Sequence, residues 1–82
     1  MENLISYVSI DPEIRFGKPC IKGTRITVTD ILQWLASGMS YEEILIDYPI
    51  LQSIHIRAAL SFAANRESFT KIITTYENPA FA

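Results

Sequence analysis

The residues best suited to bind a ligand are four cationic side chains in the segment 15–25, which contains no acidic residue. They are four of the seven Lys and Arg residues of the chain: Arg15, Lys18, Lys22 and Arg25. Gly17, Pro19 and Gly23 lie among them, and such residues favour turns. On a β-hairpin, Arg15, Lys18 and Lys22 could contact nucleic-acid phosphates, which adds affinity but little sequence selectivity.

The alternative for this segment is a structural role. Arg25 lies beside an expected helix start, where its guanidinium group could pair with Asp30 or Asp47. Thr24 and Arg25 would then hold the hairpin against that helix, with Gly17, Pro19 and Gly23 shaping its turns. A purely solvated hairpin is the third interpretation.

A second candidate surface lies on the expected helix that follows Ser53. Arg57, Ser61 and Asn65 recur at i, i+4 and i+8, so they share one face of that helix. Arg pairs with guanine and Asn with adenine by two hydrogen bonds. These residues therefore predict a DNA-reading face, although an ordinary exposed helix face could carry the same side chains, and Glu42, Glu43 and Asp47 make the preceding helix acidic.

The C-terminal segment 68–82 offers an apolar surface rather than chemistry. Phe69, Ile72, Ile73 and Tyr76 follow helical spacing, and Phe81 adds another aromatic side chain. Such a stripe could enter the groove of a partner protein. It could equally pack on its own domain or across a homodimer.

Catalysis and metal binding have little support in the sequence. Cys20 and His55 are the only cysteine and histidine, too few for a zinc site and without the local motif of a nucleophile. The acidic pairs Asp11/Glu13 and Glu42/Glu43 are explained by turns and helix starts. We expect no enzyme activity, no metal and no cofactor.

Length and composition limit the class of protein. Eighty-two residues, 49% of them apolar, indicate one small globular domain, here residues 1–67 with a tail at 68–82. The net charge of −2 argues against a general nucleic-acid coat protein. No signal peptide or membrane span is expected, and the single cysteine fits a cytoplasmic protein.

The expected elements begin with a β-hairpin. A strand is predicted over 4–10, a turn at Asp11–Pro12, a brief pairing near 14–16 and a second strand over 19–21. Helices are expected from Thr27 to a C-terminal Gly38, from Ser40 to Tyr48, and over 54–67 with Ser53 as cap. Asp30 follows Thr27 and Glu43 follows Ser40 by three residues, so both of the first two helices are expected to start with a capping box. Residues 69–76 could form a fourth helix or a strand. The fold class is therefore mainly α, a small α+β domain with a hairpin and three or four helices in a helix-turn-helix or winged-helix-like arrangement.

One set of motifs matches a known pattern over residues 8–64. It comprises Ile10-Asp-Pro-Glu13, Gly17-Lys-Pro19, Ile21-Lys-Gly-Thr-Arg-Ile26, Val28, Gly38-x-Ser40-x-Glu-Glu43-Ile44, Tyr48-Pro49 and Ala58-Ala-Leu60. The chain resembles the bacterial domain-of-unknown-function family 433, whose members look like small helix-turn-helix antitoxins. Three positions depart from the pattern: Phe16 replaces a usual glycine, Cys20 a usual valine, and His55 a common acidic residue.

This resemblance implies a role as the antitoxin of a type II toxin–antitoxin pair. The partner would be a PIN-like ribonuclease, which the antitoxin neutralises by binding, and operator DNA would be bound by a homodimer to repress the operon. The alternative is a protein-interaction or oligomerisation module that binds no DNA.

Overall fold

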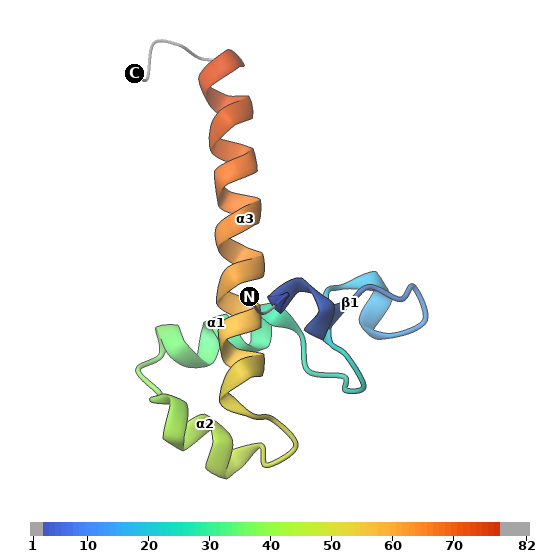
Figure 1. Ribbon diagram of the computed structural model, residues 1–82, viewed down its shortest axis with the longest axis vertical. Coiled ribbons are helices and arrows are strands. Elements are labelled where there is room, and N and C mark those ends of the chain that lie inside the picture. The colour runs from blue at the N-terminus through green and yellow to red at the C-terminus, as the bar shows by residue number, and fades with distance from the viewer. Residues whose placement is uncertain (1–2, 78–82) are drawn as a thin grey trace.

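The computed structural model describes the backbone of residues 3–77 and the side chains of residues 3–66 (Figure 1). The described elements, in chain order, are the 3-10 helix η1 (Leu4–Tyr7), strand β1 (Val8–Ser9), the 3-10 turn η2 (Arg15–Gly17), strand β2 (Cys20–Ile21) and helices α1 (Val28–Ala36), α2 (Tyr41–Asp47) and α3 (Ser53–Glu77). The fold is therefore a small α+β domain, as predicted. In the part of the chain that the structure describes, it has three α-helices rather than four.

The two strands form a short antiparallel sheet with Val8 opposite Ile21 and Ser9 opposite Cys20. On the other side of β2, the Ile21 N–H donates to the Ile26 carbonyl at 2.9 Å and Cys20 forms an isolated bridge with Thr27. Strand β2 consequently lies between β1 and the segment that leads into α1. This pairing attaches the N-terminal hairpin to the start of the first helix.

The predicted strand over 4–10 is correct only for its last part. The Ser6 N–H and hydroxyl both donate to the Asn3 carbonyl, at 3.1 and 2.7 Å, and close a 3-10 turn. The Tyr7 ring lies edge-to-face against His55 of α3, with centroids 5.6 Å apart. Local serine hydrogen bonding and the tertiary contact with α3 therefore outweigh the strand propensity of Leu4 to Tyr7.

Both predicted capping boxes are confirmed. Thr27 and Asp30 exchange side chain-to-backbone hydrogen bonds at the start of α1, and Ser40 and Glu43 do the same at the start of α2. Gly38 has a φ of +101°, the left-handed conformation that ends helices. The chain can therefore reverse between α1 and α2 without strain.

The α2 cap makes stability depend on pH. The backbone N–H of Ser40 donates to Glu43 Oε1 at 2.9 Å, and this bond, followed by the interaction with the Ser40 side chain, lowers the pKa of Glu43 below its ordinary 4.5. A lowered pKa gives stability that is present above the unfolded-state pKa and is lost as pH falls through the folded-state pKa. We expect Glu43→Gln to lower the melting temperature at pH 7, and the difference from wild type to vanish once the pH is below the folded-state pKa.

Thermal melts followed by circular dichroism between pH 7 and pH 3 measure this effect. Glu42→Gln is the matched control, since it removes a charge from the same helical turn but no bond to Ser40. An equal and pH-independent effect of both variants would contradict the assignment.

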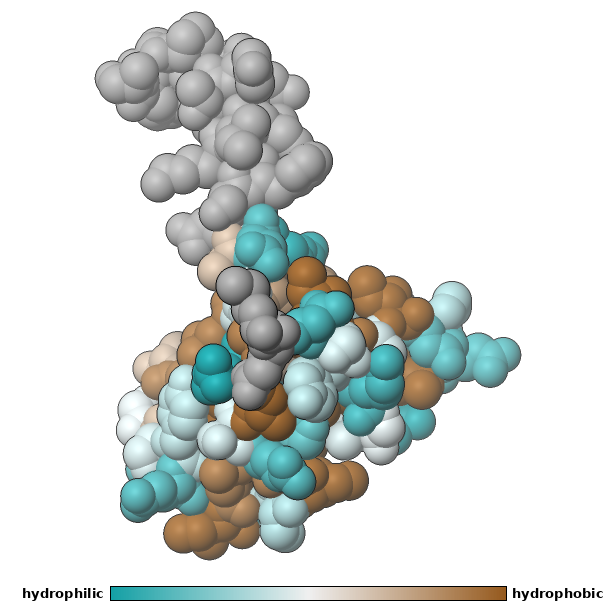
Figure 2. All heavy atoms as spheres, in the orientation of Figure 1, coloured by the Kyte–Doolittle hydropathy of each residue, from teal (hydrophilic) through white to brown (hydrophobic). Residues whose placement is uncertain are grey.

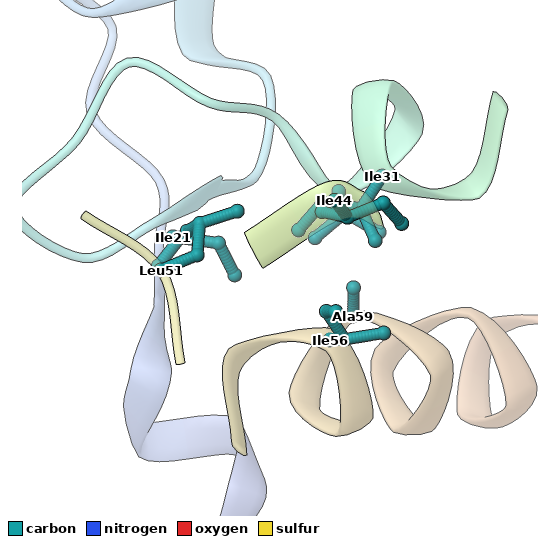
Figure 3. Packing of buried hydrophobic residues seen from close by; sticks show 7 residues of the cluster. Ile21, Ile31, Ile44, Leu51, Ile56 and Ala59 are labelled. Carbon is teal, nitrogen blue, oxygen red and sulfur yellow. The ribbon is translucent and has the colours of Figure 1, made fainter. Parts of the chain in front are cut away.

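The core lies where α1, α2 and the start of α3 meet β2 (Figure 3). Figure 3 shows Ile56 and Ala59 of α3 facing Ile31 and Ile44. The buried members of the core are Ile21, Val28, Ile31, Ile44, Leu51, Ile56 and Ala59. The Trp34 ring stacks on Tyr48 with centroids 4.1 Å apart and links α1 to the end of α2.

The last helix runs further than the sequence predicted. The end was expected at Glu67, but α3 continues to Glu77, and no Gly or Pro interrupts residues 53–77. Ser53, the predicted cap, is its first residue, and His55 Nδ1 accepts the Gln52 N–H at 2.9 Å. Figure 1 shows α3 rising far beyond the body formed by the other elements. Within the described residues, no helix is both long and apolar enough to span a membrane.

Candidate functional site

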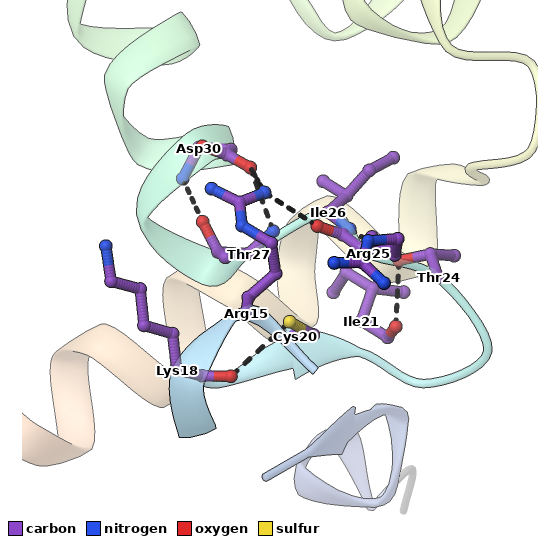
Figure 4. A network of polar contacts seen from close by, with 9 residues as sticks. All are labelled: Arg15, Lys18, Cys20, Ile21, Thr24, Arg25, Ile26, Thr27 and Asp30. Carbon is purple, nitrogen blue, oxygen red and sulfur yellow. Dashed lines mark hydrogen bonds and ion pairs between the residues drawn. The ribbon is translucent and has the colours of Figure 1, made fainter. Parts of the chain in front are cut away.

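The segment that joins the hairpin to α1 forms a polar network around Arg15 (Figure 4). Arg15 Nη1 donates to the Arg25 carbonyl at 2.9 Å and forms an ion pair with Asp30 Oδ2 at 3.4 Å. The same carboxylate oxygen accepts the Thr27 N–H at 3.0 Å. Asp30 therefore caps α1 and holds Arg15 at the same time.

This network changes the roles expected for two arginines. Arg25 was expected to pair with Asp30 or Asp47 through its guanidinium group, whereas Arg15 takes Asp30 and uses the Arg25 backbone carbonyl. The Arg25 side chain is exposed. Arg15 was predicted to contact DNA, but its charge is partly offset by Asp30, so Lys18, Lys22 and Arg25 are the exposed cations of this segment.

The turn residues shape the segment that runs from η2 through β2 to α1. Thr24 Oγ1 donates to the Ile21 carbonyl at 2.8 Å and accepts the Ile26 N–H at 3.0 Å, which closes the turn after β2. Gly17 and Gly23 have φ angles of +81° and +82°. Pro19 places its carbonyl to accept the Val28 N–H at 2.9 Å. These turns and hydrogen bonds fix the connection between the hairpin and α1, residues 17–27, here called the hairpin joint.

A feature that the sequence did not reveal precedes this joint. Arg15 and Phe16 have φ angles of +51° and +61°, which side-chain-bearing residues rarely adopt. Phe16 is 96% exposed. Its replacement of the usual glycine was the available signal, because glycine adopts positive φ at no steric cost.

The predicted DNA-reading residues lie on the first half of α3. Arg57 and Asn65 are exposed and Ser61 is half-buried. The face of α3 that enters the core carries Ile56 and Ala59 instead. The predicted partner-binding side chains, Phe69, Ile72, Ile73, Tyr76 and Phe81, lie outside the described side chains.

Cys20 and His55 have separate partners. The buried Cys20 thiol donates to the Lys18 carbonyl at 3.3 Å, while His55 accepts from Gln52 and contacts Tyr7. Among the described residues, no group of three or more His, Cys, Asp or Glu side chains is arranged to hold a metal ion.

Comparison with known proteins places the chain in a family. Residues 8–63, more than half of the chain, match the family model described as a protein of unknown function, DUF433. The chain belongs to the DUF433 family. A crystal structure of a DUF433 member from Anabaena variabilis superposes with a TM-score of 0.69 at 28% identity, covering 83% of this chain and 68% of that one.

The chain is also similar to an uncharacterised protein of Sinorhizobium fredii, with 38% identity over 56 residues. The aligned region is 68% of this chain but 25% of that protein. The DUF433 chain thus spans about a quarter of the length of this relative. The family match includes the Arg15 network, both capping boxes and the first turns of α3, and it ends before the last part of α3.

Proposed function

We propose that this DUF433 protein is an antitoxin that binds a PIN-like ribonuclease and neutralises it by occlusion, without catalysis of its own. The observation that carries the proposal is the length of α3. At about 1.5 Å per residue, a helix of 25 residues is about 37 Å long. Among the described side chains of α3, residues 53–66, the fully buried ones are Ile56, Ala58 and Ala59, all within the first two turns.

The later turns of α3 supply the partner-binding element in this proposal. Most helical stability in proteins comes from packing of an apolar face rather than from helix propensity. Residues Phe69, Ile72, Ile73 and Tyr76 follow i, i+3, i+4, i+7 spacing, the pattern of helices that bind in apolar grooves. A groove on the ribonuclease would stabilise this part of α3, and the bound helix would cover the active site or the path of the RNA.

Co-expression with a PIN-like ribonuclease encoded by the neighbouring reading frame tests the proposal. We expect the chain to relieve growth arrest and to bind the ribonuclease in a pull-down. Ile72→Asp and Ile73→Asp should each weaken binding at least 10-fold, since a buried carboxylate without a partner is strongly unfavourable. Thr74→Asp, outside the apolar spacing, is the matched control. A wild-type chain that neither binds the ribonuclease nor relieves the arrest would refute the proposal.

Operator binding is a second candidate function, favoured by the α2–turn–α3 arrangement. Two helices joined by the short turn at 48–52 are compatible with a helix-turn-helix, in which the second helix enters the major groove. Arg57 and Asn65 are exposed on α3, and Lys18 and Lys22 are exposed on the hairpin joint. A homodimer would supply two such units to a two-fold operator.

Fluorescence anisotropy with the upstream DNA at several salt concentrations tests operator binding. Arg57→Ala should weaken binding about 10-fold for the operator, since a good base contact contributes discrimination of about 1–3 kcal/mol. Lys22→Ala should weaken binding to all sequences and reduce the salt dependence. If no binding occurs even at low salt, the protein acts as a protein-binding module alone.

A further inference from the structure

Two exposed apolar side chains lie in surroundings of opposite charge. The first is Phe16, 96% exposed in the loop formed by residues 14–18, here called the Phe16 loop. The segment 15–25 contributes three exposed cations, Lys18, Lys22 and Arg25, and no acidic residue, while Asp11 and Glu13 precede the loop on its N-terminal side. Full exposure of a phenylalanine in water is unfavourable, so its presence calls for an explanation.

The Phe16 loop is held in place by several bonds. Arg15 binds the Arg25 carbonyl and Asp30, the Gly17 N–H donates to the Ile14 carbonyl at 3.1 Å, and the Lys18 N–H donates to the Arg15 carbonyl at 3.2 Å. These bonds maintain two consecutive non-glycine residues at positive φ. Uncommon backbone conformations that are held in this way concentrate at functional sites. The loop therefore presents Phe16 in one defined position.

The second exposed side chain is Ile46 on the outer face of α2. Ile46 is 77% exposed, and Ile50, in the turn that follows α2, is 61% exposed. At helical spacing Ile46 lies between Glu42 and Glu43 on the preceding turn, and Asp47 follows it. All three acids are exposed, and α2 carries no cation. We call this surface, defined by Glu42, Glu43, Ile46, Asp47 and Ile50, the Ile46 face.

We propose that the Phe16 loop of one molecule docks on the Ile46 face of a second copy of the same chain. The aromatic ring would cover Ile46 and Ile50, while Lys18 and Lys22 would approach Glu42 and Glu43. Figure 1 shows the loop near β1 and helix α2 on different sides of the molecule, and Figure 2 shows apolar surface at both places. Each surface can therefore contact a different molecule, or two molecules can contact each other through both surfaces at once.

A second copy fits both surfaces better than other partners do. DNA phosphates would attract the Phe16 loop but would be repelled by the Ile46 face, and would leave Ile46 and Ile50 in water. A second copy fits both surfaces, because the ring and cations of one Phe16 loop complement the apolar side chains and acids of the other molecule's Ile46 face. The contact is small, so we expect a dissociation constant on the order of 100 µM, in the range of weak interfaces. This inference does not depend on the proposed antitoxin role.

Sedimentation equilibrium of the full chain between 10 µM and 1 mM, in low and high salt, tests the contact. Wild type should associate with rising concentration, and less in high salt because exposed charges are screened. Phe16→Gly and Ile46→Lys should each reduce association at least 10-fold. Ile5→Lys is the matched control, since Ile5 is also exposed, at 53%, but lies outside both surfaces. Phe16→Gly should retain the fold because glycine tolerates positive φ.

Mixing the two variants gives the sharpest result. Phe16→Gly retains the Ile46 face and Ile46→Lys retains the Phe16 loop, so an equimolar mixture should associate more strongly than either variant alone at the same total concentration. The molar mass that wild type reaches at the highest concentrations shows whether the contact forms a closed dimer or an open head-to-tail chain of molecules.

The proposal is overturned if wild type stays monomeric at 1 mM, if both variants associate like wild type, or if the mixture stays monomeric. Circular dichroism melts identify a variant that fails to fold. In that case Lys18→Glu and Glu42→Lys replace the pair: each should weaken association, and their mixture should restore it.

Discussion

Ile44→Ala is expected to lower the free energy of unfolding by about 3–4 kcal/mol, the usual cost of removing most of a buried isoleucine side chain. Ile44 is completely buried and belongs to the cluster in which Ile31 and Ile56 meet from α1 and α3. A domain of this size has a total stability of about 4–12 kcal/mol. The substitution therefore removes a large share of the stability of the domain.

Urea denaturation at 25 °C, followed by Trp34 fluorescence, measures this loss. Trp34 is the only tryptophan and stacks on Tyr48 between α1 and α2, so its emission reports on the packing of α2. Ile46→Ala is the matched control, because it makes the same change two residues away at an exposed site and should shift stability by less than about 0.5 kcal/mol. Equal losses in the two variants would show that α2 packs differently.

Thr27→Val is expected to lower the free energy of unfolding by about 2 kcal/mol, at the upper end for helix caps. Thr27 is buried, and its Oγ1 accepts the Asp30 N–H at 2.9 Å. Valine keeps the shape but leaves that amide without its acceptor. Loss of the cap also loosens Asp30, which holds Arg15, so the effect extends beyond α1 into the hairpin joint.

Thr29→Val provides the control, since Thr29 lies exposed in the first turn of the same helix. It should leave the urea midpoint almost unchanged, because the propensities of Thr and Val in helices are similar. Hydrogen exchange should show faster exchange of the amides in α1 for Thr27→Val. A Thr27→Val protein as stable as Thr29→Val would mean that the buried hydroxyl contributes nothing to the helix start.

The starts of α1 and α2 could be predicted because their determinants are local. Thr27 with Asp30 and Ser40 with Glu43 lie three residues apart, and Gly38 is the only glycine between them. Such pairs define a helix start from neighbouring residues alone. Residues 69–76 were left open between a fourth helix and a strand, because their apolar spacing is helical whereas threonine favours strands. They continue α3 instead, and no Gly or Pro interrupts the helix before Glu77.

The partner of Asp30 could not be predicted in the same way. Arg25 is nearer in sequence, but Arg15 reaches Asp30 because Arg15, Phe16 and Gly17 take successive positive φ angles and turn the chain back. The glycine usual at the position of Phe16 was a signal for one positive φ angle, but nothing in the sequence indicates the second one at Arg15. The exposure of Phe16 and of Ile46 likewise depends on which neighbours cover them in three dimensions. Tyr7 was placed in a strand because its contact with His55 spans most of the domain.

The contact between η1 and α3 determines the order in which the domain can assemble. Residues 4–7 are the first described element, yet they pack on the helix that starts at Ser53. During synthesis from the N-terminus, the caps of α1 and α2 can form early, but η1 has no surface to cover until α3 has emerged. Contacts between residues so far apart in sequence slow folding and make it cooperative. A nascent chain that ends at Gln52 therefore lacks Ile56 and Ala59, which complete the core around Ile21, Ile31 and Ile44.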